Sequence, residues 1–126
     1  MKRLLIVLAI IISAASVFAK APNLAVEKLF DGRYDKEKSV RTSIQKSSEY
    51  YYRSLHVTNN AEIVRTIESA IRQDSRKSEK VFEQSGEGGK SISVKIINNG
   101  EPIYMGIQQY NGSAFFYIKG AKKAFE

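Results

Sequence analysis

Apolar side chains in the middle of the chain recur with the period of a helix. Over residues 61–73, polar and charged side chains fill the positions between them. The apolar positions are Ile63, Ile67, Ala70 and Ile71. This spacing predicts an amphipathic helix with one buried face. The stretch Thr58–Asn60 offers an N-cap, and Glu68 and Arg72 have the separation and order of a helix-surface ion pair.

A shorter apolar pattern lies upstream. Val26, Leu29 and Phe30 fall on one face of a predicted helix over residues 24–30, which Asn23 is expected to cap. Further on, Val40, Thr42 and Ile44 alternate with polar residues, as in a half-buried strand. A second strand over residues 49–57 completes a predicted hairpin.

From residue 79 onward the period is two, which predicts a meander of about four antiparallel strands. Three turn signals separate these strands: residues 85–89, 98–100 and 111–112. A last helical turn is expected over residues 121–125. The fold class is therefore α+β: an antiparallel sheet, made of an N-terminal hairpin and a C-terminal meander, with one main amphipathic helix packed on one face. The position of the hairpin in the sheet stays open.

The first 19 residues have the pattern of a cleavable signal peptide. Lys2 and Arg3 precede an apolar run, and Val17 and Ala19 occupy the small-residue positions before a cut after Ala19. The competing interpretation is a retained anchor, but the apolar run is shorter than the about 20 residues that a span needs. We expect a single mature α+β domain over residues 20–126, exported to the periplasm or the medium, with no membrane span after cleavage.

Composition limits the partners further. The chain has no cysteine, so neither disulfides nor a lipid-modified cysteine are available. The formal net charge is +7, and removal of Lys2 and Arg3 leaves 18 basic and 13 acidic residues. A basic excess favours anionic partners, although an exported protein is not expected to bind nucleic acid.

The segment from Tyr50 to His56 is the main candidate for a site. Strand alternation places Tyr50, Tyr52, Ser54 and His56 on one face, opposite Tyr51, Arg53, Leu55 and Val57. The second face is predicted to be buried. Tyr50 and Tyr52 suit a stacking platform for a sugar or another flat ligand, with His56 beside them and Tyr104 and Tyr117 as possible neighbours. An ordinary two-sided sheet explains the same tyrosines.

Catalytic and cofactor motifs are weak in this sequence. Ser54 and His56 suggest a hydrolase-like pair, but no carboxylate shares their strand face and no GxSxG motif is present. Gly89-Lys90-Ser91 ends like a phosphate-binding loop, yet a strand pattern follows it. Asn111-Gly112-Ser113 fits a glycosylation acceptor but coincides with a turn. One histidine and no cysteine give no metal-ligand pattern. We therefore expect no cofactor, no metal and no enzymatic activity.

Three stretches resemble a family of small exported bacterial proteins that is classed as a domain of unknown function: residues 24–34, 52–59 and 116–120. This resemblance implies export across the inner membrane of a Gram-negative cell and one small domain, and it implies no activity. The expected function is that of a binding or accessory protein of the cell envelope, whose partner is an envelope protein or a glycan. The alternative is a small hydrolase that uses Ser54 and His56.

Overall fold

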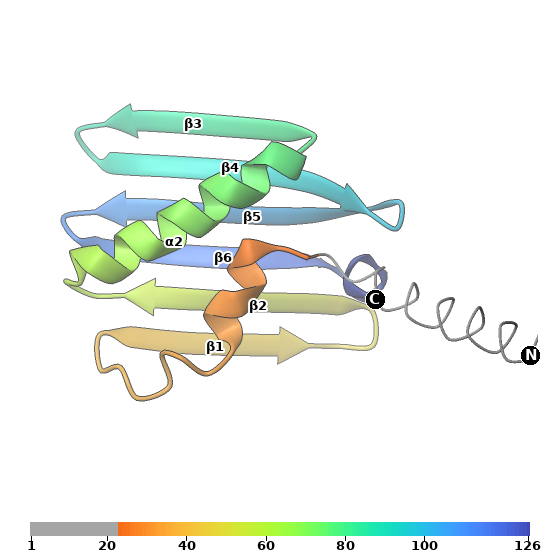
Figure 1. Ribbon diagram of the computed structural model, residues 1–126, viewed down its shortest axis with the longest axis horizontal. Helices are drawn as coiled ribbons and strands as arrows, with labels where there is room; N and C mark the ends of the chain where they lie inside the picture. The colour runs from red at the N-terminus through yellow and green to blue at the C-terminus, as the bar shows by residue number, and fades with distance from the viewer. Residues whose placement is uncertain (1–22) are drawn as a thin grey trace, which may run out of the picture.

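Six antiparallel strands form one sheet in the computed structural model, which describes residues 23–126. The strands are β1 (Val40–Lys46), β2 (Tyr50–Val57), β3 (Lys80–Gly86), β4 (Gly89–Asn98), β5 (Glu101–Tyr110) and β6 (Ser113–Ala121). Their order across the sheet is β1-β2-β6-β5-β4-β3. The α-helix α2 (Ala61–Asp74) and the 3-10 helix η1 (Ala25–Phe30) lie on one side of the sheet (Figure 1). The predicted α+β fold with a hairpin, a meander and one main helix is confirmed.

The path of α2 explains where the first hairpin joins. The helix leaves the end of β2 and crosses the sheet diagonally, and the short helix η2 (Ser75–Lys77) then leads into β3 at the far edge (Figure 1). Fourteen helical residues span about 21 Å, and four strand spacings cover about 19 Å. The meander then returns strand by strand, so its last strand, β6, pairs with β2.

Tight turns hold the meander in register. Asn99 and Gly100 form the two-residue turn between β4 and β5, and both have positive φ angles, 56° and 74°. Asn111 and Gly112 form the turn between β5 and β6 in the same way, with φ angles of 46° and 78°. These are the primed turns that Asn-Gly sequences favour, and the turn interpretation of both motifs is confirmed.

The core lies between the sheet and the two helices. Val64, Ile67 and Ile71 of α2 are buried against the inward side chains of the central strands. Those strands contribute Leu55, Val57, Ile92, Val94, Ile96, Ile103, Met105, Ile107, Phe116 and Ile118. The predicted burial of Ile67 and Ile71 is therefore confirmed. Ile63, which was also expected on the buried face, is only partly buried, and Val64 is buried instead.

The first strand is more exposed than its alternation predicts. Thr42 and Ile44 pair with Leu55 and Arg53 and so face the helix side as expected, but Ile44 is 53% exposed. The reason is geometric, because β1 is the edge strand and α2 runs away from it toward β3 (Figure 1). Only Val40 packs against the core.

The N-terminal helix differs from its prediction in its cap. It is a 3-10 helix that begins at Ala25, and no side chain from its own N-terminus caps it. The buried carboxylate of Asp74, the last residue of α2, instead accepts hydrogen bonds from the backbone N–H groups of Ala25 and Val26, at 2.6 and 2.9 Å. The expected capping by Asn23 is wrong, since a more distant acceptor satisfies these groups.

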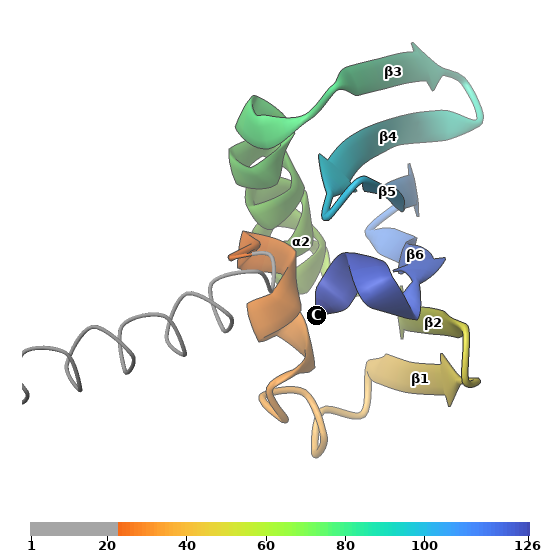
Figure 2. The same cartoon turned by 90° about the vertical axis from the view of Figure 1, so that its right-hand side faces the viewer.

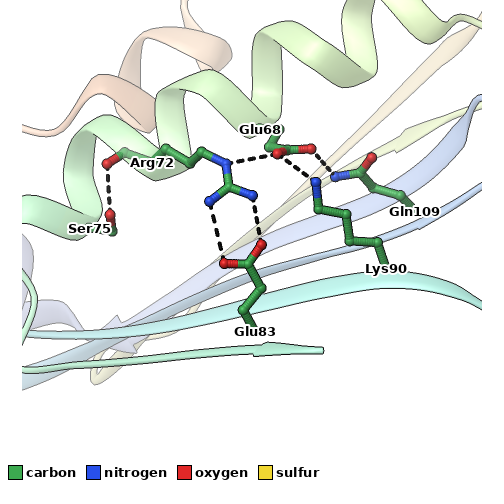
Figure 3. Close-up of polar contacts among 6 residues, drawn as sticks. All are labelled: Glu68, Arg72, Ser75, Glu83, Lys90 and Gln109. Carbon is green, nitrogen blue, oxygen red and sulfur yellow. Dashed lines mark hydrogen bonds and ion pairs between the residues drawn. The ribbon is translucent and has the colours of Figure 1, made fainter. Parts of the chain in front are cut away.

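Polar contacts hold α2 to the far half of the sheet (Figure 3). The carboxylate of Glu68 accepts from Gln109 Nε2 at 2.6 Å, from Lys90 Nζ at 2.9 Å and from Arg72 Nε at 2.8 Å. Arg72 also donates two hydrogen bonds to Glu83 of β3. The predicted ion pair between Glu68 and Arg72 is confirmed, and it is one part of a network that joins the helix to β3, β4 and β5.

Arg53 joins η1, β2 and the C-terminal 3-10 helix η3 (Lys122–Phe125). Its side chain is buried, and its guanidinium donates to the carboxylate of Glu27. The guanidinium carbon also lies 4.3–5.4 Å from the ring centroids of Phe30, Tyr51 and Phe125. The predicted buried face of β2 therefore contains a charge that an ion pair and three rings accommodate.

The predicted signal peptide and its cleavage after Ala19 lie outside the described residues. Within residues 23–126, no helix is long and apolar enough to cross a membrane.

Candidate ligand-binding face

One side of the sheet is not covered by any helix of residues 23–126. Both α2 and η1 lie on the opposite side (Figure 2). We call the uncovered side the open face. Directly paired residues of an antiparallel sheet project to the same side, so the strand registers identify its members. They are Arg41, Ser43, Gln45, Tyr50, Tyr52, Ser54, His56, Lys80, Phe82, Gln84, Ser91, Ser93, Lys95, Ile97, Pro102, Tyr104, Gly106, Gln108, Tyr110, Ser113, Phe115, Tyr117, Lys119 and Ala121.

The open face is rich in aromatic side chains. Five of the seven tyrosines of the chain project from it. Several of its large apolar or aromatic side chains are exposed, namely Tyr50, Phe82, Ile97, Tyr104, Tyr110 and Phe115. Single exposed apolar residues are normal on a protein surface, but six large ones on one side of a single sheet favour an interaction surface.

The three residues singled out in the sequence all belong to the open face. Tyr50 is 42% exposed, His56 is exposed, and Tyr52 is half-buried between neighbours. Tyr50 and His56 are at opposite ends of β2, six residues apart, so they lie roughly 20 Å from each other. One small ligand does not touch both, and only an extended ligand or a protein surface spans them.

The centre of the open face is built around Tyr117. A Cβ atom at residue 106 would lie 2.9 Å from Tyr117 Cε1, so the ring rests against Gly106 of the neighbouring strand. Burial raises the pKa of the Tyr117 hydroxyl, and the nearby Tyr52 raises it further. The ammonium of Lys119 lies 5.6 Å from the centroid of the same ring. Glycine at 106 thus leaves room for the ring, which a larger side chain would displace.

A shallow groove crosses the end of the open face near the turns of the meander. Its volume is about 480 Å³. His56 and Phe115 lie at one end, with their ring centroids 6.2 Å apart in an edge-to-face arrangement. Amide and hydroxyl side chains of the open face line much of the remainder, namely Gln84, Ser91, Gln108 and Ser113. Neutral hydrogen-bonding groups next to aromatic rings suit a polar ligand that has ring faces.

The hydrolase-like pair has no supporting contact in this geometry. Ser54 and His56 share the open face as expected, but Ser54 is only 6% exposed and lies between Ser43 and Tyr117. Among residues 23–126, no hydrogen bond joins Ser54 to His56, and no carboxylate forms a hydrogen bond or ion pair with either side chain. The described residues also contain no cluster of three or more His, Cys, Asp or Glu side chains that suits a metal ion.

The charges of the sheet are divided between its two sides. Both acidic residues of the six strands, Glu83 and Glu101, project to the helix side, since they pair with Ile92 and Asn98. The open face instead carries four basic side chains, those of Arg41, Lys80, Lys95 and Lys119. It is therefore a basic and aromatic surface without a strand carboxylate.

The comparison with protein families gives one match. The Family of unknown function (DUF6108) matches residues 13–102. The chain belongs to this family. The match includes two of the stretches that suggested the resemblance, residues 24–34 and 52–59, and it ends before residues 116–120. Searches of the curated proteins and of the solved structures found no match.

The family match covers only part of the open face. It covers β1 to β4, with Tyr50, Tyr52, His56, Lys80 and Lys95, and it ends at the start of β5. Sequence reasoning identified Tyr50, Tyr52, Tyr104 and Tyr117 as candidates for one face, but it noted the lack of carboxylates only for the strand of Ser54 and His56. The alternation within each strand shows which side chains share a side of that strand. The residues of the whole face can be named only when the registers that pair the six strands are known.

Proposed function

We propose that the protein is an exported, non-enzymatic binding or accessory domain of the bacterial cell envelope. Its ligand lies on the open face of the sheet, where Tyr50, Tyr52 and His56 belong to a larger set of aromatic and basic residues. Export rests on the N-terminal pattern, with cleavage after Ala19 and a mature chain of residues 20–126. The partner is an envelope protein or a glycan.

The observation that carries this proposal is the uncovered aromatic group on an otherwise ordinary sheet. An antiparallel sheet with one packed side commonly presents alternating polar residues to water on the other. Here Tyr104, Tyr110 and Phe82 are exposed on that side, at 40%, 59% and 58%. Such a surface tends to promote aggregation unless a partner covers it, which supports a binding role.

Affinity capture tests the proposal. The processed chain is immobilised, exposed to an envelope extract of the cells that export it, and compared with the double variant Tyr52→Ala/Tyr104→Ala. We expect the native chain to retain a component that the double variant loses. The control is Arg65→Ala, because Arg65 is exposed on α2, on the covered side of the sheet. Equal retention by all three proteins would refute the binding role of the open face.

The location is tested separately. N-terminal sequencing of the protein recovered from the cell exterior or the periplasm is expected to begin at Lys20. Recovery of the unprocessed chain from the cytoplasm would contradict the export part of the proposal.

A further inference from the structure

One cross-strand row of the open face combines positive charge with aromatic rings. Lys80 of β3 pairs with Lys95 of β4, which pairs with Tyr104 of β5. Tyr104 pairs with Lys119 of β6, which pairs with Tyr52 of β2. These five side chains, here called the basic row, cross five neighbouring strands. At a strand spacing of about 4.8 Å the row is roughly 19 Å long.

The pair formed by Lys80 and Lys95 does not help the fold. Like charges directly opposite each other in a sheet are destabilising. Neither ammonium group has an ion-pair partner among residues 23–126, although nearby Lys90 and Arg72 on the helix side both have one. An anionic ligand on the open face would neutralise this repulsion, which is the complementarity expected of a binding surface.

The basic row binds through side chains alone. Strands β2, β4, β5 and β6 each have a neighbour on both sides, so their backbone groups are used within the sheet. A peptide could add as a further strand only at the free edge of β3, beyond Lys80, where it would not cover Tyr52, Tyr104 or Lys119. The ligand must offer negative groups to the lysines and flat faces to Tyr52 and Tyr104, which lie on either side of Lys119.

We propose that the basic row binds an acidic oligosaccharide, a chain of sugar rings that carry carboxylates. The chain lies across the strands, with its carboxylates toward Lys80, Lys95 and Lys119 and its ring faces against Tyr52 and Tyr104. This inference rests on the proposed function, because an exported protein meets acidic glycans rather than nucleic acid. It assigns the ligand class and the direction in which the ligand lies.

Direct binding of a galacturonic acid hexasaccharide to the processed chain tests the inference, with the carboxyl-reduced hexasaccharide as the neutral control. We expect the reduced sugar to bind at least tenfold more weakly. Tyr104→Ala is expected to weaken binding of the acidic sugar by up to tenfold, through lost ring contact. Lys95→Gln and Lys119→Gln each weaken it by about twofold to fivefold at low salt, and less at high salt. Arg65→Ala, on the covered side, leaves binding unchanged.

A charge reversal separates binding from folding. Lys80→Glu places a carboxylate opposite Lys95, so the melting temperature is expected to rise while affinity for the acidic hexasaccharide falls. If Lys80 had only a structural role, its replacement would not raise the melting temperature and lower the affinity for the acidic sugar at the same time. A fall in melting temperature, or unchanged affinity, would overturn the role of this pair.

Binding measurements with two other anionic ligands decide between ligand classes. A glutamate hexapeptide and a single-stranded oligonucleotide of similar charge are measured against the same variants. If either binds as tightly as the acidic hexasaccharide, or if the acidic and reduced sugars bind equally or not at all, the assignment to an acidic glycan is overturned. If Tyr52→Ala/Tyr104→Ala still loses its envelope partner in that case, the proposed function stands and only the ligand class is wrong. If the double variant keeps the partner, both are wrong.

Discussion

The carboxylate of Asp74 accepts a hydrogen bond of 2.9 Å from the backbone N–H of Val26, 48 residues away in the sequence. Its other oxygen accepts from the N–H of Ala25, so the last residue of α2 caps the first turn of η1. This contact ties the two helices together on one side of the sheet. No helix of residues 23–126 lies on the other side, which is the arrangement that the proposed binding role requires.

Replacement of Asp74 by alanine is expected to lower the free energy of unfolding by about 2–4 kcal/mol. Two backbone N–H groups would lose their acceptor, and each unsatisfied buried group costs about 1–3 kcal/mol. Urea denaturation measures the change. Gln73→Ala, at the exposed neighbouring position, is the control and should change stability by less than about 0.5 kcal/mol. A loss at Asp74 no larger than at Gln73 would show that the cap is dispensable.

The network around Glu68 predicts a pH dependence of stability. Partial burial alone would raise the pKa of Glu68, but hydrogen bonds from Gln109, Lys90 and Arg72 outweigh it and lower the pKa to about 2. A carboxyl group whose pKa is lower in the folded than in the unfolded state stabilises the fold above its unfolded pKa. That stabilisation is lost as the pH falls from about 4.5 toward about 2.

Glu68→Gln is therefore expected to be less stable than the native chain at pH 7, by about 1–2 kcal/mol. The difference should shrink as the pH falls below about 4.5 and vanish only below about pH 2. Urea denaturation of both proteins across this range is the measurement. A difference that stays constant with pH would mean that the charge of Glu68 does not contribute.

Local patterns in the sequence determined much of this fold. The period of α2, the alternation of the strands and the Asn-Gly turns are set by residues close in sequence, and they predicted the elements and the two sides of β2. The cap by Asp74 was not predictable in the same way, because it joins residues 48 or 49 positions apart. The exposure of Ile44 was missed since it depends on where the helix passes and not on the strand itself.

The candidate site was predicted only in part, for the same physical reason. Tyr50, Tyr52 and His56 were assigned to one strand face, and the structure places them on the open face. The basic row needs the registers of four strand pairs before Lys80 and Tyr52 can be placed in one line. Those registers depend on the return of the meander to β2, which the sequence left open.

The buried ion pair of Arg53 predicts an unusual order of variant stabilities. Glu27→Gln leaves the guanidinium buried without a carboxylate and is expected to cost about 2–3 kcal/mol. Arg53→Met places an apolar side chain among Phe30, Tyr51 and Phe125, and its cost should be about 1 kcal/mol or less, because burial of a charge is itself unfavourable. Thermal or urea denaturation gives both values. The reverse order would mean that the arginine contributes more through its ring contacts than its charge costs.

The tyrosine at the centre of the open face should titrate late. Burial and the neighbouring Tyr52 raise the pKa of Tyr117 above its ordinary value of 10.0. Spectrophotometric titration of tyrosinate is expected to show a last ionisation step that Tyr117→Phe removes. Gly106→Ala should displace the ring and move this step toward pH 10. If Tyr117→Phe leaves the late step in place, the ring is not buried against Gly106.

Hydroxyl-radical footprinting tests the central claim, that the open face is the binding surface, most directly. The processed chain is oxidised with and without its captured envelope partner, and modification is measured residue by residue. The account predicts protection of Tyr50, Tyr104 and Phe82, which are exposed on the open face, and unchanged modification of Tyr34 and Tyr51, which lie outside it. Protection confined to Tyr34, Tyr51 or α2, with Tyr104 and Phe82 still fully reactive, would contradict it.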